Sequence, residues 1–432
     1  MPEFFTPAVA SWSLLAAGCF FAWVASNIYR SVRFFTPMTI VSFMAGWIVS
    51  ESVPHQIVLQ VLVSAGLVQF GALGDWPGQI GLGLAVVAWL GMLPSWRDSH
   101  GSRQVFDEAL RDALGDYEPQ LPALTTEWKA PFGRGLMPLM LWDPRVKVHK
   151  NIRYAPGAGP RHLLDVHVSK SGAKGAPVLL QIHGGGWFTG SKEQQAQPLM
   201  GSMTAEGWIC VALNYRLSPR SAFPAHLIDV KLCIAWIKEH IAEYGGDPEF
   251  IAVTGGSAGG HLASLAALTA NDPEFQPDCP DADTTVQAAV PLYGVYDVTA
   301  EHRSHEALVD FASKSVWQKS YVGNEDLFRR SSPVHRVGAH APPFFVVNGD
   351  TDSFTHVEGA RYFVDELRKV SQQPVAFAEL RNTQHNFDMF HSPKVTHACR
   401  AIHQFLTLAY LRHQGARAAS APQDVGAIAQ ES

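Results

Sequence analysis

The stretch that most constrains this chain runs from Ile251 to Gly260, a strand-like apolar segment that reaches a glycine-flanked serine and then becomes helical. Gly255 and Gly259 flank Ser257 in a Gly-x-Ser-x-Gly frame. Such a frame is typical of a sharp strand-to-helix turn, where the serine backbone is strained and neighbouring segments approach too closely for side chains. We therefore expect the Ser257 hydroxyl to lie exposed above a sheet. The alternative is an ordinary Gly-rich tight turn.

Length, charge and cysteine content narrow the class of protein. The 432 residues exceed one small domain but fit a single large α/β domain with an appendage. The net charge of −6 gives no electrostatic basis for binding nucleic acid. Five scattered cysteines without a CxxC pair argue against a disulfide framework or a zinc knuckle.

Residues 1–95 are predicted to form transmembrane helices. The run from Ala8 to Ile28 carries no charge and reaches the ~20 residues that cross a bilayer. Two further apolar runs, 57–73 and 80–93, are joined by the breaker-rich turn Gly74–Gly78. This pattern is typical of a helical hairpin that follows a first span.

The distribution of basic residues favours three spans. With three spans, Arg30 and Arg33 fall on the same side as Arg97 and Arg103, which is the positive-inside arrangement. Four spans would place the two groups on opposite sides. The remaining apolar stretch, 34–50, is then expected at the membrane interface or inside the bundle. We therefore predict a multi-pass membrane protein whose C-terminal part is cytoplasmic.

Residues 96–147 are predicted to connect the membrane segment to a large domain. The region is mixed and rich in proline, but Val105, Phe106, Ala109 and Leu110 share one helical stripe that must pack against another part of the molecule. We expect either a connector resting on the membrane or a piece of a lid.

Residues 148–412 alternate strand-like and helix-like segments, which predicts an α/β fold with a mostly parallel sheet covered on both faces. Ligands bind beyond the carboxyl ends of the strands in such sheets. The insertion 298–343 is a candidate lid, and the tail 413–432 is predicted to be disordered. Eight strands are expected, at 149–154, 162–168, 178–182, 209–213, 250–253, 288–292, 344–347 and 375–380.

A glycine-rich segment, His183–Trp187, directly follows the strand 178–182. Three successive glycines leave backbone N–H groups free, as an oxyanion-binding loop requires. We expect the amides of Gly184 and Gly185 to converge with that of Ala258. A flexible turn with an anchoring tryptophan is the alternative.

A serine hydroxyl needs a base, and the base needs an acid that orients it. On a sheet of this kind both are expected after the serine, at the ends of later strands. Asp350 and Asp352 follow the strand 344–347, and His385 follows the strand 375–380 with no helix between. These positions predict His385 as the base and leave two aspartates as candidates for the acid.

Together these segments resemble the α/β-hydrolase esterases of the hormone-sensitive-lipase-like group, which includes the arylacetamide deacetylases. The resemblance covers about residues 151–409 and is carried by His183–Trp187, Asn214–Pro219, Phe223–Ala225 with Asp229, Gly255–His261, Gly349-x-x-Asp352 and His385.

The resemblance implies the α/β-hydrolase fold, no cofactor, and short-acyl or aryl ester substrates. It also implies a role for each matching residue. Ser257 is the nucleophile, Asp352 rather than Asp350 is the acid and His385 is the base, with Gly184, Gly185 and Ala258 as the oxyanion donors.

Two departures from the family pattern lie next to the acid and the base. Ser353-Phe354 follow the acid, where many members have a proline-hydrophobic pair, and Asn386 stands where many have glycine. Asparagine also adopts positive φ, so the turn after His385 is expected to persist. The family pattern further suggests an ion pair between Arg216 and Asp229.

We therefore predict a membrane-anchored serine esterase or lipase acting on lipophilic esters, with the lipid bilayer as its partner. An amide or formamide hydrolase or deacetylase on the same fold is one alternative. A membrane binding or transport protein with a regulatory hydrolase-like domain and an inactive scaffold are others. No metal is expected, because His302 and His305 have no third ligand at fixed spacing. The natural substrate and the oligomeric state stay open.

Overall fold

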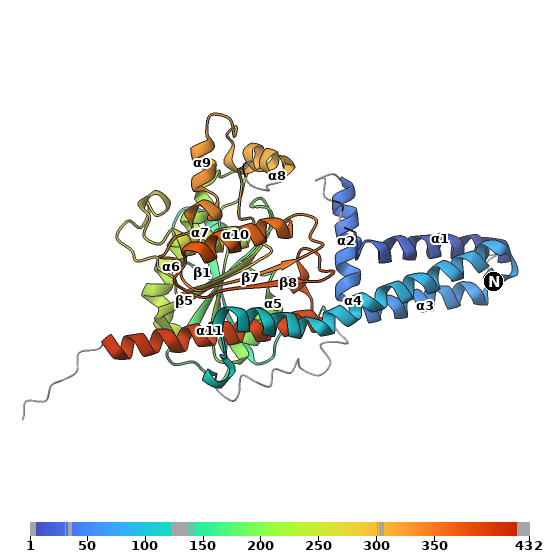
Figure 1. Cartoon of the computed structure of the whole chain (residues 1–432), viewed down its shortest axis with the longest axis horizontal. Coiled ribbons are helices and arrows are strands. Elements are labelled where there is room, and N and C mark those ends of the chain that lie inside the picture. The colour runs from blue at the N-terminus through green and yellow to red at the C-terminus, as the bar shows by residue number, and fades with distance from the viewer. Residues whose placement is uncertain are drawn as a thin grey trace, which may run out of the picture.

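A helical bundle projects from one side of a sheet-containing domain (Figure 1). The computed structural model describes residues 6–30, 32, 37–121, 138–139, 141–299, 301 and 306–420. Most of the apolar N-terminal region thus extends away from the sheet.

Eight strands form one sheet in the order β1-β2-β4-β3-β5-β6-β7-β8. The first two pairings, β1 with β2 and β2 with β4, are antiparallel, and all others are parallel. The prediction of a mostly parallel sheet is confirmed. The strands are β1 Val146–Arg153, β2 Leu163–Ser169, β3 Ala176–Ile182, β4 Ile209–Leu213, β5 Gly246–Gly256, β6 Ala288–Leu292, β7 Phe344–Gly349 and β8 Val375–Leu380.

Helices cover both faces of the sheet and bury it (Figure 1). One face packs against α6 (Ala225–His240), α7 (Ala258–Leu268) and α10 (Val357–Val370). The other packs against α5 (Gln197–Ala205), α11 (Pro393–Ser420) and part of α4. Because side chains alternate along a strand, Leu180 enters the first core and Leu179 the second.

The last helix, α11, is longer than predicted. It continues to Ser420, so residues 413–420 are helical rather than part of a disordered tail. The ring of Phe250 contacts Tyr410 and His413, and Arg417 pairs with Asp247 at 3.4 Å. These contacts with β5 keep the extra turns against the domain. The rest of the predicted tail, 421–432, lies outside the described residues.

The N-terminal bundle contains α1 (Pro7–Ser26), α2 (Pro37–Glu51), α3 (Val53–Gln69) and α4 (Trp76–Leu114). Helices α1, α3 and α4 extend away from the sheet, and α2 stands across their base (Figure 1). Within the described residues, α1 and α4 are each long and apolar enough to cross a membrane. The pair α2–α3 reaches that length only when both halves are taken together, and it is bent by 102°.

Helix α4 joins the two parts of the molecule without a break. The sequence predicts an apolar run at 80–93 and a separate helical stripe around Val105 and Leu110, but one helix passes through Pro94. Proline removes a single N–H group from the helix ladder, and packing of the following turns offsets that loss. Phe106 is fully buried beneath the sheet, and Asp107 pairs with Arg400 at 2.7 Å. The predicted apolar stripe therefore packs on the α/β domain.

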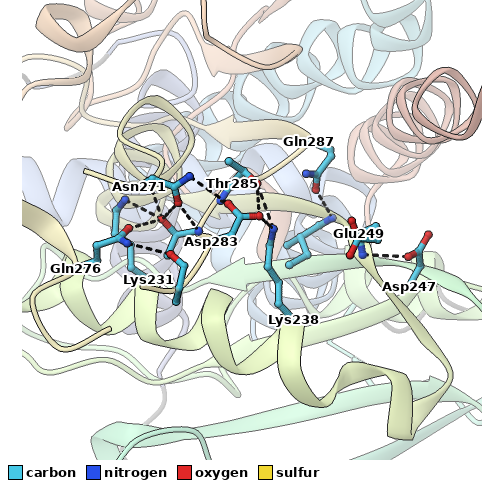
Figure 2. A network of polar contacts seen from close by, with 12 residues as sticks. Lys231, Lys238, Asp247, Glu249, Asn271, Gln276, Asp283, Thr285 and Gln287 are labelled. Atoms are coloured by element: carbon cyan, nitrogen blue, oxygen red, sulfur yellow. Dashed lines mark hydrogen bonds and ion pairs between the residues drawn. The ribbon is translucent and has the colours of Figure 1, made fainter. Parts of the chain in front are cut away.

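A polar network holds the connection between α7 and β6 against α6 (Figure 2). The ammonium group of Lys231 is buried and donates to Thr284 Oγ1 at 3.2 Å and to the carbonyl of Thr269. Its burial lowers the pKa of Lys231 to about 8. About two turns further along α6, Lys238 forms an ion pair with Asp283. These contacts fix the approach to β6.

The same network reaches β5. Gln287 accepts a hydrogen bond from the N–H of Ile251 at 2.8 Å (Figure 2). Parallel pairing then sets Gly256 beside Leu292 at the other end of the two strands. Fixing β5 against β6 where their pairing begins thus fixes where the residue after β5, Ser257, lies.

Candidate active site

Ser257 occupies a sharp turn between β5 and α7. Its backbone has φ 59° and ψ −122°, outside the regions that non-glycine residues usually adopt. Its N–H donates to the carbonyl of Leu292 at 3.0 Å. A Cβ atom on Gly255 would lie 2.5 Å from the carbonyl oxygen of Ile182, and one on Gly259 would overlap the same oxygen. Both glycines of the frame are therefore required by close packing against β3.

His385 follows β8 and is oriented by a carboxylate. Its Nδ1 lies 2.7 Å from Oδ2 of Asp352, and both side chains are buried. The other carboxylate oxygen accepts hydrogen bonds from the N–H groups of Phe354 and Thr355, each at 2.8 Å. With Nδ1 donating to the carboxylate, Nε2 of His385 is left as the proton acceptor.

The structure separates the two candidate aspartates. Asp352 lies against His385, whereas Asp350 accepts hydrogen bonds from the backbone at Thr383 and Asn382. Burial raises the pKa of Asp350. Two residues that are adjacent candidates in the sequence thus have different partners in the fold.

Ser257 and His385 line the same cavity, which has a volume of about 400 Å³. Its lining contains no Asp, Glu, Lys or Arg among the described residues. The walls are mainly apolar and include Ile40, Phe43, Phe188, Leu308, Phe311 and Phe354.

The predicted lid insertion 298–343 supplies one wall of this cavity, through Leu308 and Phe311. Trp317 of the same insertion is instead buried in the core, where its ring stacks on Phe223 at 5.0 Å. Of the described part of 96–147, no residue lines the cavity. The described part of that region joins the N-terminal bundle to the α/β domain through α4.

The glycine loop after β3 differs from the prediction at one position. The N–H of Gly184 donates to Oε1 of Gln195 at 2.5 Å, so this amide is occupied, contrary to the prediction that it binds an oxyanion. Gly185 and Gly186 line the cavity and have φ of 110° and 61°. Ala258 begins α7. The roles of Gly185 and Ala258 stay predictions, and Gly186 is a candidate that the sequence reasoning missed.

Trp187 ties this glycine loop to the helix that follows the serine. Its Nε1 donates to Nδ1 of His261 at 3.2 Å, and Nε2 of His261 donates to the carbonyl of Ser331 at 2.8 Å. These two bonds require a neutral imidazole with its proton on Nε2. Burial favours the same form and lowers the pKa of His261 to about 4.

The predicted ion pair behind the loop is confirmed. Arg216 Nη2 lies 2.6 Å from Oδ1 of Asp229, which also contacts Nε2 of His162 at 3.1 Å. The neighbouring Tyr215 hydroxyl donates to the carbonyl of His183 at 2.8 Å. The segment 214–219 is thereby fastened to the base of the glycine loop.

Helix α2 contributes a wall that the sequence reasoning missed. The ring of Phe43 lies 6.3 Å from that of His385 and 5.0 Å from that of Phe354. Trp47 Nε1 donates to the carbonyl of Asn386 at 2.8 Å. Asn386 has φ 59°, the positive value expected for the turn after the histidine. The only signal in the sequence was the length of the 34–50 stretch, which is short for a span.

A buried ion pair fixes the C-terminal end of α2. Glu51 Oε1 lies 2.7 Å from Nζ of Lys394 at the start of α11, and its Oε2 accepts a hydrogen bond from Ser392 at 2.8 Å. All three side chains are buried. Buried charges need such partners, so the pair specifies one docked position for α2.

Tyr293 and Asp388 form a second pair beside His385 that the sequence did not predict. The Tyr293 hydroxyl donates to Asp388, and the Tyr293 ring lies 4.6 Å from the imidazole. Burial raises the pKa of both Tyr293 and Asp388. Thr355 Oγ1 donates to the carbonyl of Tyr293 at 2.9 Å. The acid, the base and β6 are thus joined in one cluster.

The described residues contain no group of three His, Cys, Asp or Glu side chains that could hold a metal ion. His302 and His305, the pair considered from the sequence, lie outside the described residues.

Known proteins match this chain in its α/β region. A family model described as BD-FAE matches residues 164–367. LipM of Mycobacterium tuberculosis, a probable carboxylic ester hydrolase, is 54% identical over 242 residues, which are 56% of each chain. Esterase LipC of the same organism is 38% identical over 313 residues, covering 72% of this chain and 76% of that protein. The match thus spans little more than half of LipM and about three quarters of LipC.

A solved structure matches the fold as well. Esterase B from Lactobacillus Rhamnosis superposes with a TM-score of 0.55 over 73% of this chain and 99% of that one, at 18% identity. At this identity the likeness concerns the fold, a mostly parallel sheet with the α/β-hydrolase arrangement.

We expect acid to destabilise the protein through the buried histidines around the site. Burial lowers the pKa of His183 and His261 to about 4 and that of His226 to about 3. Below about pH 6.5 these histidines bind protons in the unfolded chain but stay neutral in the folded chain. The free energy of unfolding therefore falls as the pH drops toward 4. The loss is on the order of 3 kcal/mol for each residue.

Denaturant unfolding of the detergent-solubilised protein at several pH values measures this loss. His261→Gln is expected to be less stable at pH 7 but to show a shallower decline between pH 6.5 and 4. His100→Gln, at an exposed site, is the control and is expected to keep the parental slope. If the free energy of unfolding changed equally with pH in all three proteins, the lowered pKa of His261 would be contradicted.

Proposed function

Because the chain belongs to the α/β-hydrolase esterases of the hormone-sensitive-lipase-like group, we propose that it is a carboxylic ester hydrolase with a Ser257–His385–Asp352 triad. One observation carries the proposal. The serine on the strained turn and the histidine that is hydrogen-bonded to Asp352 line the same apolar cavity.

In the proposed reaction, Ser257 Oγ attacks the ester carbonyl while Nε2 of His385 takes its proton. Asp352 holds the imidazole by its Nδ1–H and stabilises the imidazolium that forms. The histidine then protonates the departing alcohol. A water molecule, activated in the same way, releases the acid from the acyl-enzyme.

The oxyanion of the tetrahedral intermediate is assigned to three backbone amides. Gly184 is excluded because Gln195 accepts its hydrogen bond. The next two amides of the loop, those of Gly185 and Gly186, belong to residues that line the cavity. The amide of Ala258, at the start of α7, completes the set. Such fixed donors stabilise developing negative charge strongly in a site that excludes water.

The cavity favours neutral, lipophilic esters. Its walls offer apolar surface and no charged partner among the described residues. A substrate with a carboxylate or phosphate near the ester would lose its hydration without gaining an ion pair. The acyl or alcohol group is therefore expected to be a hydrocarbon or an aryl group.

We further propose that α1, α3 and α4 cross the membrane and leave the hydrolase domain in the cytoplasm. Trp76 and Trp96 lie about 30 Å apart along α4, which matches the thickness of the hydrocarbon core and the position of interfacial aromatic residues. Arg30 and Arg97 are exposed at the end nearest the domain. The positive-inside rule favours the cytoplasm for that end.

Ser257→Ala tests the nucleophile. We expect this variant to lose covalent labelling by a fluorophosphonate probe and to lose at least about 10⁴-fold in esterase activity, because no other group supplies the attacking oxygen. Ser202→Ala, on α5, is the matched control and is expected to label normally. Labelling of Ser257→Ala at the parental rate would sink the proposal.

Asparagine substitutions distinguish the two aspartates. Asp352→Asn is expected to lower kcat for p-nitrophenyl acetate by about 10³- to 10⁴-fold, since the amide favours the wrong histidine tautomer. Asp350→Asn is expected to stay within about tenfold of the parent, because its partners are backbone amides rather than His385. The reverse pattern would assign the acid to Asp350.

Alkaline phosphatase fusions in a bacterial host test the topology. The enzyme is active only outside the cytoplasm, so a fusion after Ser420 is expected to be inactive. A fusion at Asp75, in the turn between α3 and α4, is expected to be active. An active fusion at Ser420 would place the hydrolase domain on the other side.

A further inference from the structure

The orientation of α2 relative to the candidate spans is the first observation. Helix α2 has 15 residues, about 22 Å, which is too short to cross a bilayer. It is bent by 102° from α3. If α3 runs along the membrane normal, α2 must lie nearly parallel to the membrane surface, at the base of the bundle (Figure 1).

The exposed face of α2 is entirely apolar. Its exposed side chains are Pro37, Met38, Ile40, Val41, Met44 and Ile48. The only charged residue on the helix, Glu51, is buried in the ion pair with Lys394. A helix that lies in a membrane interface usually turns a polar face to water. Here the hydrolase domain covers the opposite face, so no polar face is needed.

The covered face of α2 lies on the catalytic groups. Phe43 packs against His385, and Trp47 donates to the carbonyl of Asn386. An α-helix with its side chains is about 10 Å thick. The exposed apolar face is therefore separated from the proposed base by a single helix.

The cavity lining includes one exposed side chain on this helix and one directly after the glycine loop. Ile40 and Phe188 both line the cavity and are 57% and 50% exposed. They are the two most exposed large apolar side chains of the lining. An apolar rim of this kind favours entry from hydrocarbon over entry from water.

We propose that α2 lies in the bilayer surface and that the cavity takes neutral acyl esters directly from the membrane, past Ile40 and Phe188. The occupant of the exposed α2 face is lipid, because this face is continuous with the apolar helices of the bundle and carries no charge. The inference rests on the proposed ester hydrolase function and adds the source of its substrate.

The test uses the full chain in phosphatidylcholine vesicles. Val41→Glu places a charge on the exposed face of α2 at a residue that is 49% exposed and does not line the cavity. We expect the turnover of dioleoylglycerol embedded in the vesicles to fall by about tenfold or more, because the charge lifts α2 from the lipid. Hydrolysis of water-soluble p-nitrophenyl acetate is expected to stay within about twofold.

Two further variants keep the result interpretable. Val322→Glu adds the same charge at a 78% exposed site in the insertion 298–343 and is expected to leave both activities unchanged. Met44→Gln changes the same face of α2 without a charge and is expected to shift the ratio of the two activities in the same direction. Met44→Gln thus tests the inference even if the Val41→Glu protein fails to insert into the membrane.

Three outcomes would overturn the inference. Equal loss of both activities in Val41→Glu and in Met44→Gln would mean that α2 supports the catalytic groups and does not deliver substrate. If neither activity falls, substrate arrives from water. A change of oligomeric state in Val41→Glu, measured by crosslinking in the vesicles, would assign the face to a second copy of the chain. Two results separate this inference from the proposed function. A parent protein that hydrolyses neither ester would contradict the esterase proposal, and full activity in Ser257→Ala would contradict the assignment of the nucleophile.

Discussion

The close approach of β3 to the turn between β5 and α7 is the constraint on which the rest of the site depends. The carbonyl oxygen of Ile182 occupies the space that side chains at Gly255 and Gly259 would need. Because Gly255 and Gly259 have no side chains, the turn can close against β3, and Ser257 can hold its positive φ above the sheet. The same approach brings the glycine loop, which begins directly after Ile182, to the serine. One steric condition thus sets the nucleophile and the loop that faces it.

Much of the domain was predictable because its sequence pattern is local. The strands β4, β6 and β8 begin and end where the apolar runs predict. Parallel strands then carry the residues after them to one edge of the sheet. That geometry was enough to predict that His385 lies near an aspartate. It could not choose between Asp350 and Asp352, because the loop after β7, rather than the strand, decides which carboxylate turns toward the imidazole.

The parts that were missed depend on contacts between distant residues. Gln195 reaches back to Gly184 from eleven positions downstream, and no local pattern reports that bond. The continuity of α4 through Pro94 is secured by packing against α11, which lies about 300 residues later. For the same reason the sequence predicts α2 only as an apolar stretch at the membrane interface or inside the bundle. Its partners, Asn386 and Lys394, are more than 330 residues away in the sequence.

The docking of α2 also gives a physical meaning to the two departures from the family pattern. Both departures contact this helix: Phe354 packs against Phe43, and the carbonyl of Asn386 accepts the hydrogen bond of Trp47. The accompanying Ser353 bonds to Gln384, so the loops of the acid and the base are joined on the side that α2 covers. A change in the position of α2 therefore acts on the loop that carries the acid and on the turn after the base together. In the bilayer position that we propose for α2, a force on this helix would act on the same cluster and so on the geometry of Asp352 and His385.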